Sequence, residues 1–94
     1  MNEIQKYISK NESKMLEDLF SLIRIPSISA KPEHHDDMLA CAERWAQLLI
    51  EAGADEALVM PSKGNPIVFG QKTVDPTAKT VLIYAHYDVM PAEP

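Results

Sequence analysis

The chain has 94 residues, of which 46% are hydrophobic and 24% are charged, so it has room for about one small globular domain and is too apolar for a disordered one. Its formal net charge is −5, with 9 Lys and Arg against 14 Asp and Glu. This balance argues against a nucleic-acid partner, because no clustered positive surface is available for phosphate groups.

The beginning of the chain is polar and lacks the apolar stretch and small-residue cleavage site of a secretory signal. No apolar run elsewhere approaches the roughly 18 residues that a membrane helix requires. The chain has 1 Cys, which excludes an intrachain disulfide and a Cys-based zinc cage and agrees with a reducing compartment. We therefore expect a cytoplasmic protein with no membrane partner.

A first helix is predicted from Ile4 to Ile23, because apolar residues recur there at steps of three, four or seven and so share one face. Asn11 interrupts this apolar stripe and predicts a kink or an exposed turn. Pro26 ends the segment, since the residue before a proline is pushed out of the helical region. Residues 25–29 are expected to be extended or to form a loop.

A second helix is predicted from Pro32, which is tolerated in a first turn, to Gly53, the expected left-handed residue that ends the helix. The sequence His-His-Asp-Asp at 34–37 is interpreted as a solvated helix start, because adjacent helical residues make a poor chelate. Within the apolar stripe, Cys41 is interpreted as a small core residue rather than a nucleophile, and Trp45 as an anchor against the sheet.

Three strands are expected after the second helix, at residues 56–60, 66–70 and 80–85, with turns and polar connections between them. The last is uninterrupted and β-branched, a pattern typical of a strand covered on both faces. The order helix, helix, strand, strand, strand predicts an α/β fold in which two N-terminal helices pack on a short β-sheet.

The residues of chemical interest come directly after the 80–85 strand. Ligand sites in open α/β sheets collect beyond the carboxyl ends of the strands, and residues i and i+2 of a strand lie on the same side. His86 and Asp88 are therefore expected to project together, close enough to hydrogen-bond. Such a pair serves as a metal ligand with its orienting carboxylate, as a general base with its partner, or as a structural hydrogen bond alone.

Two motifs carry a resemblance to a known family. The first is Ala85-His86-Tyr87-Asp88-Val89-Met90-Pro91, which follows an apolar strand. The second is the early loop Ile25-Pro26-Ser27-Ile28-Ser29. Together they resemble the M20 family of zinc metallopeptidases, and most closely the branch that includes carnosine dipeptidases. Family members typically read Gly-His-Tyr-Asp-Val-Gln-Pro at the first motif, so Ala85 and Met90 are departures. Neither departure removes a metal ligand.

The resemblance implies that His86 is a ligand of one of two zinc ions and that Asp88 is the catalytic-site residue that orients its imidazole. It also implies that the other ligands and the general base lie downstream of Pro94. Residues 1–94 are then the N-terminal portion of an M20-type catalytic domain, without the family's lid and dimerisation domain. The expected activity of the full-length form is hydrolysis of dipeptides or small peptides, whereas the 94 residues alone are expected to be inactive and to bind zinc weakly.

A different function is compatible with the same residues: a small, non-catalytic α/β module used in protein association, in which His86 and Asp88 form a structural pair. A strand whose neighbours are missing also exposes an unpaired edge and an apolar face, which invite pairing with another chain. We therefore expect the 94-residue chain to self-associate.

Overall fold

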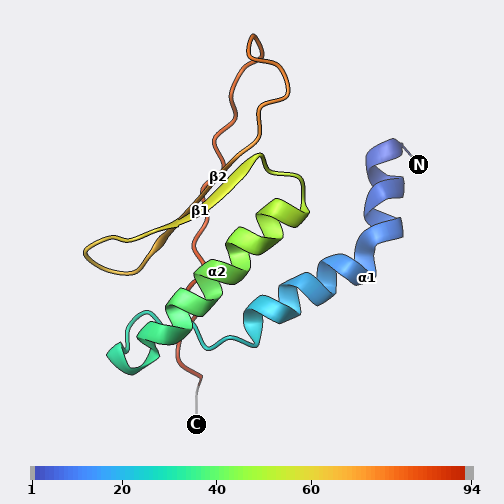
Figure 1. Ribbon diagram of the computed structural model, residues 1–94. Coiled ribbons are helices and arrows are strands. Elements are labelled where there is room, and N and C mark those ends of the chain that lie inside the picture. The colour runs from blue at the N-terminus through green and yellow to red at the C-terminus, as the bar shows by residue number, and fades with distance from the viewer. Residues whose placement is uncertain (1, 93–94) are drawn as a thin grey trace.

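The computed structural model describes residues 2–92. Figure 1 shows the elements of this range, which are helix α1 (Glu3–Ile23), the short 3-10 helix η1 (Pro32–His34), helix α2 (His35–Glu51), and strands β1 (Glu56–Met60) and β2 (Ile67–Gln71). The two strands form one antiparallel sheet. The predicted α/β fold class is confirmed, and the first two predicted strands lie within one residue of their predicted positions.

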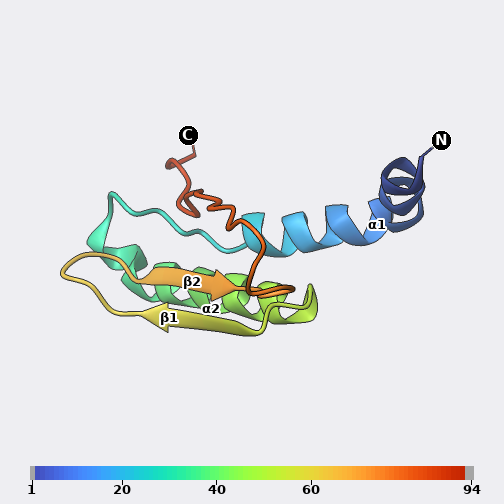
Figure 2. The same cartoon turned by 90° about the horizontal axis from the view of Figure 1, so that it is seen from above.

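Helix α2 packs against both strands of the β1–β2 hairpin and against α1, so it is the central element of the fold (Figure 2). The hairpin register runs from Glu56 opposite Gln71 to Met60 opposite Ile67. A Cβ added at Gly70 would lie 2.9 Å from Leu49 Cδ1 of α2. The glycine therefore permits a close approach of helix and strand that a larger residue would push apart.

The C-terminal end of α2 forms as the sequence predicts, whereas its start differs from the prediction. Pro32 is the first residue of the 3-10 helix η1, where its missing N–H costs no hydrogen bond, and α2 itself begins at His35. At the other end Gly53 has a φ of +107° and donates its N–H to the Ile50 carbonyl at 3.0 Å, while the Ala54 N–H reaches the Leu49 carbonyl at 2.9 Å. This Schellman arrangement satisfies two of the carbonyls that a helix end leaves free.

The apolar core of the described residues is small. Its buried members are Met38, Cys41 and Ala42 of α2, which are 3%, 1% and 0% exposed. The interpretation of Cys41 as a core residue is confirmed, and burial raises the pKa of its thiol, which disfavours the reactive thiolate. Trp45 is partly buried and lines a groove beside β2.

Helix α1 covers the predicted range but buries none of its residues. It begins with a capping box, in which Asn2 Oδ1 accepts the Gln5 N–H at 2.8 Å and Gln5 Oε1 accepts the Asn2 N–H at 3.1 Å. The Asn11 side-chain amide donates to the Tyr7 carbonyl at 2.9 Å, and α1 bends partway along its length (Figure 1). A side chain that bonds into the backbone ladder is one physical cause of such a bend.

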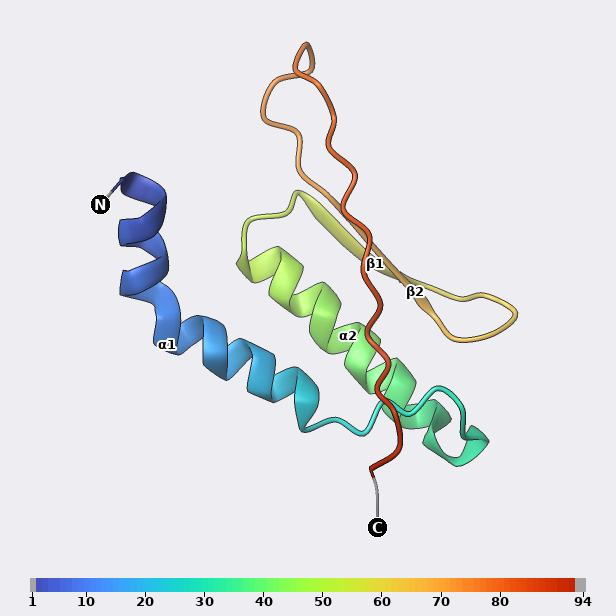
Figure 3. The ribbon, with the colours of Figure 1, turned by 180° about the vertical axis from the view of Figure 1, so that it is seen from behind.

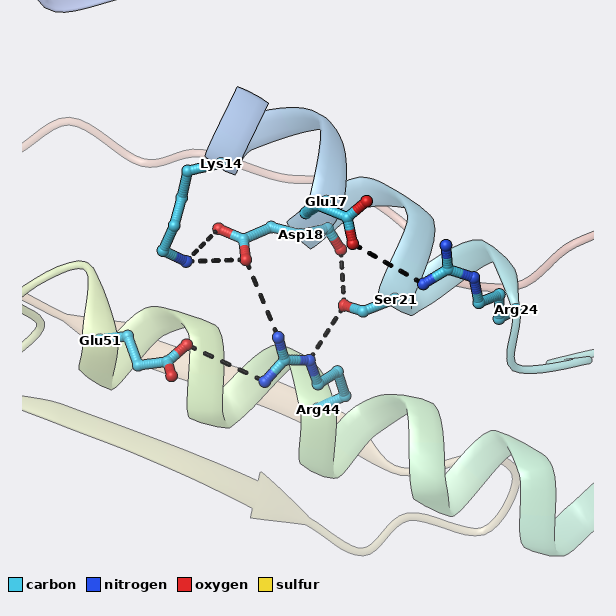
Figure 4. Close-up of polar contacts among 7 residues, drawn as sticks. All are labelled: Lys14, Glu17, Asp18, Ser21, Arg24, Arg44 and Glu51. Carbon is cyan, nitrogen blue, oxygen red and sulfur yellow. Dashed lines mark hydrogen bonds and ion pairs between the residues drawn. The ribbon is translucent and has the colours of Figure 1, made fainter. Parts of the chain in front are cut away.

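A polar network centred on Arg44 joins α1 to α2 (Figure 4). Arg44 Nε donates to Ser21 Oγ at 3.0 Å, and Ser21 Oγ donates to the Asp18 carbonyl at 2.7 Å. The Arg44 guanidinium also lies 3.8 Å from the Asp18 carboxylate and 3.9 Å from the Glu51 carboxylate. These contacts join the two helices through polar groups, while several large apolar side chains of α1 stay 40–71% exposed.

We predict that Arg44→Ala lowers the free energy of unfolding by about 1 kcal/mol, because it removes the hydrogen bond and the ion pairs of a side chain that is only 25% exposed. Urea denaturation followed by circular dichroism measures the change. Arg24→Ala is the matched control, since Arg24 is 67% exposed and lies 3.9 Å from Glu17 on its own helix; it should cost less than about 0.5 kcal/mol. Equal losses in the two variants would contradict the role of Arg44.

The prediction of a buried third strand at residues 80–85 is wrong. Figure 3 shows the segment as an extended trace, but within residues 2–92 it joins no sheet, and Val81, Leu82, Ile83 and Tyr84 are 81–91% exposed. After β2 the chain leaves the plane of the hairpin (Figure 2). A β-branched run favours extended backbone, but burial depends on a neighbouring strand, which the run itself does not specify.

A groove of about 980 Å³ lies between this segment, α2 and β2. Its walls include Trp45 and Leu49 from α2, Ile67 from β2, and residues 81–88. No backbone hydrogen bond of residues 81–84 is formed within the described chain. The segment therefore presents both apolar side chains and unpaired backbone groups to its surroundings.

We expect the chain to self-associate through residues 80–85, which carry no charge, no Gly and no Pro and have an unpaired edge. The double variant Leu82→Lys, Tyr84→Lys should shift the chain toward monomer in sedimentation velocity. The control Ile4→Lys, Tyr7→Lys adds the same charge at exposed apolar positions of α1 and should leave association unchanged. A wild-type chain that is monomeric at high concentration would contradict the prediction, as would equal loss of association in both variants.

Candidate functional site

The loop after α1 holds the C-terminal segment in place. The Val89 N–H donates to the Ser27 carbonyl at 2.9 Å, and Ile28 and Val89 form a parallel bridge. Ser27 is fully buried, and its hydroxyl donates to the Tyr87 carbonyl at 2.9 Å across a sequence separation of 60 residues. Figure 3 shows the two segments meeting near the start of α2. Residues 27–29 thus act as a short extended partner for residues 87–89.

Tyr87 fastens the same segment to the hairpin connection. Its hydroxyl donates to the Pro66 carbonyl at 2.6 Å, and the Cys41 thiol lies 3.8 Å from the Tyr87 carbonyl oxygen, as a weak donor. Burial raises the pKa of Tyr87, so the phenol keeps the proton that it donates. The backbone that carries His86 and Asp88 is therefore fixed at the residue between them.

His86 and Asp88 lie together on the same side of the segment. His86 Nδ1 is 2.7 Å from Asp88 Oδ1, and Ser29 Oγ donates to Asp88 Oδ2 at 2.5 Å. The hydrogen bond from Ser29, followed by the contact with His86, holds the pKa of Asp88 below its ordinary value. The carboxylate is therefore ionised at neutral pH, and its two oxygens are occupied by different partners.

This arrangement suits one ligand of a metal site. A metal-bound imidazole usually gives its other N–H to a carboxylate, which fixes the tautomer and raises the basicity of the ring. With Nδ1 engaged by Asp88, His86 has Nε2 left for a metal, on a side chain that is 78% exposed. Across residues 2–92, no group of three or more His, Cys, Asp or Glu side chains could hold a metal ion. Since a catalytic zinc usually takes three protein ligands, a complete site requires ligands in addition to His86.

The start of α2 contains a local contact between two side chains. His34 Nδ1 lies 2.8 Å from Asp37 Oδ2, one helical turn further along, while His35 and Asp36 are exposed. The acidic first turn lies at the positive end of the helix dipole. The 34–37 sequence thus forms a helix start, as predicted, although the pairing of His34 with Asp37 is an additional finding.

The sequence does not reveal Ser27 and Ser29 as part of the site. Two serines that alternate in an extended segment are a usable signal, because alternate side chains share one side. Their partners, however, lie 60 and 59 residues further along the chain. No local pattern specifies contacts over that distance.

Comparison with known proteins finds dipeptidases. The chain is 29% identical over 105 residues to a Cys-Gly metallodipeptidase of Schizosaccharomyces pombe and 30% identical over 86 residues to a cysteinylglycine-S-conjugate dipeptidase of Corynebacterium striatum. It is 32% identical over 101 residues to a Cys-Gly metallodipeptidase of Candida albicans. These alignments cover 90–98% of the chain and 19–21% of the relatives, so the chain spans about a fifth of their length. No family model and no solved structure matches the chain.

The similarity is therefore to metal-dependent dipeptidases, and it runs through the site segment as well as the helices, since it covers nearly all of the chain. The names of the two fungal relatives describe a metal-dependent enzyme, which agrees with the chemistry of the His86–Asp88 pair. As to membranes, no helix within residues 2–92 is both long and apolar enough to cross one.

Proposed function

We propose that this chain is the N-terminal portion of the catalytic domain of an M20-type zinc metallodipeptidase, in which His86 binds one of two metal ions and Asp88 orients its imidazole. The observation that carries the proposal is the 2.7 Å contact between His86 Nδ1 and Asp88 Oδ1, which leaves Nε2 for a metal. The similarity to Cys-Gly metallodipeptidases along 90–98% of the chain supports it.

The residues of this chain have a limited part in the chemistry. When bound, the metal ions supply an activated water and polarise the scissile carbonyl. His86 offers one imidazole nitrogen, and Asp88 keeps the proton of that ring on the nitrogen away from the metal. Because the described residues contain no group of three metal-binding side chains, we expect the 94 residues alone to bind Zn²⁺ weakly and to cleave no peptide.

The names of the relatives indicate which peptide to test first. The proposed substrate is a small dipeptide such as Cys-Gly or its S-conjugates, which these names specify. A place in the carnosine-dipeptidase branch remains a prediction from the sequence motifs. A cytoplasmic location and the use of zinc rather than another divalent metal are parts of the same proposal.

In the whole protein that carries this segment, we predict that His86→Ala abolishes hydrolysis of Cys-Gly, because it removes a metal ligand. Asp88→Asn should retain some metal and some activity, since loss of an orienting partner costs about 10–100-fold. Dipeptide hydrolysis and bound zinc are measured on the purified variants. His35→Ala replaces an exposed histidine at the start of α2 and should behave as wild type. Normal activity in His86→Ala, or a wild-type protein that cleaves no dipeptide, would contradict the proposal.

One observation favours a second function. The apolar segment at 80–85 is exposed and unpaired, as expected for a non-catalytic module that associates with other chains. In that case His86 and Asp88 are only a structural pair. Association that persists in His86→Ala, combined with the absence of dipeptide cleavage by the whole wild-type protein, would favour this alternative.

A further inference from the structure

We propose that Ser29 is a positioning residue, which holds the Asp88 carboxylate in the orientation that keeps the His86 ring proton on Nδ1 and leaves Nε2 free to bind a metal. The use of Nε2 as a metal ligand rests on the proposed function. The orientation of Asp88 by Ser29 rests on contacts that can be tested without a metal.

The two oxygens of Asp88 have separate partners from distant parts of the chain. Ser29 Oγ donates to Oδ2 at 2.5 Å, and His86 Nδ1 lies 2.7 Å from Oδ1. A carboxylate that is hydrogen-bonded at one oxygen can rotate about its Cβ–Cγ bond and exchange its two oxygens. A carboxylate that is hydrogen-bonded at both oxygens cannot, so Asp88 presents one oxygen to His86 in a fixed direction. Since an ionised carboxylate only accepts hydrogen bonds, the hydrogen on this contact belongs to His86 Nδ1.

Backbone pairing between two segments places Ser29 beside Asp88. The bridge between Ile28 and Val89 and the bond from the Val89 N–H to the Ser27 carbonyl align residues 27–29 with residues 87–89. The two serines then have different roles. Ser27 is fully buried and binds the Tyr87 carbonyl, so it supports the backbone. Ser29 is exposed and binds only the Asp88 side chain among the described contacts, so its loss leaves no cavity.

The test reads the His86 tautomer directly, from ring-nitrogen signals in ¹⁵N NMR at about pH 8.5, where an ordinary histidine is neutral. Samples are the 94-residue chain and its variants, at a concentration where sedimentation shows monomer. In the wild type the proton should be on Nδ1. Ser29→Ala should shift the ring signals toward the Nε2–H tautomer, because the freed carboxylate no longer presents Oδ1 to the ring. Ser29→Thr keeps a hydroxyl and should restore the wild-type signals.

Ser62→Ala is the matched control, because the hydroxyl of Ser62 is also exposed and donates a 2.6 Å hydrogen bond, to the Asn65 carbonyl in the β1–β2 connection. It should leave the His86 signals unchanged. The positioning role is overturned if His86 keeps the Nδ1–H tautomer in Ser29→Ala, if Ser62→Ala produces the same shift, or if the wild type carries its proton on Nε2.

The zinc content of the whole protein separates this inference from the proposed function, because the 94 residues alone are expected to bind Zn²⁺ weakly. In the whole protein, His86→Ala should lose bound zinc. If it keeps its zinc while Ser29→Ala still changes the tautomer in the 94-residue chain, the positioning role of Ser29 stands and the metal-ligand role of His86 fails.

Discussion

The contact between residues 27–29 and residues 87–89 is the constraint on which the arrangement of this chain depends. It joins segments that are 59 and 60 residues apart, and the closure of so long a loop costs conformational entropy. Only three apolar residues of the described chain, all in α2, are buried. The contacts that hold residues 87–89 include several polar ones: a backbone hydrogen bond, a buried serine hydroxyl, and the phenol of Tyr87 on the Pro66 carbonyl.

The same constraint accounts for the geometry of the candidate site. In an extended segment successive side chains point to opposite sides. Tyr87 reaches back to the hairpin connection, which directs His86 and Asp88 to the other side, where they meet each other and Ser29. His86 ends this chain of contacts with an exposed ring. In the proposed metal site this pair would supply one ligand, His86, with its orienting groups in place, and residues 2–92 contain no group of three or more side chains that could hold a metal ion by themselves.

The features that could be predicted from the sequence are those with a local cause. Apolar periodicity predicts both helices, Gly53 marks the end of α2, and short apolar runs on either side of a turn predict strands β1 and β2. The pairing of His86 with Asp88 follows from the two-residue period of an extended chain.

The rest depends on contacts between distant residues. The 80–85 run favours extended backbone but does not specify a neighbour, so its predicted burial is wrong. The amphipathic pattern of α1 likewise predicts a helix without saying how much of its apolar side becomes covered. Ser29 and Arg44 act through partners on other elements, and no spacing in the sequence identifies them.

Amide hydrogen exchange at Val89 tests most directly whether residues 27–29 hold the C-terminal segment. The Val89 N–H is bonded to the Ser27 carbonyl at 2.9 Å, whereas the N–H groups of residues 81–84 have no backbone partner within the described chain. In a monomeric sample, Val89 should therefore exchange far more slowly than Leu82 and Ile83. A Val89 amide that exchanges as fast as those two would show that the contact does not persist in solution, and the account of the site would fail with it.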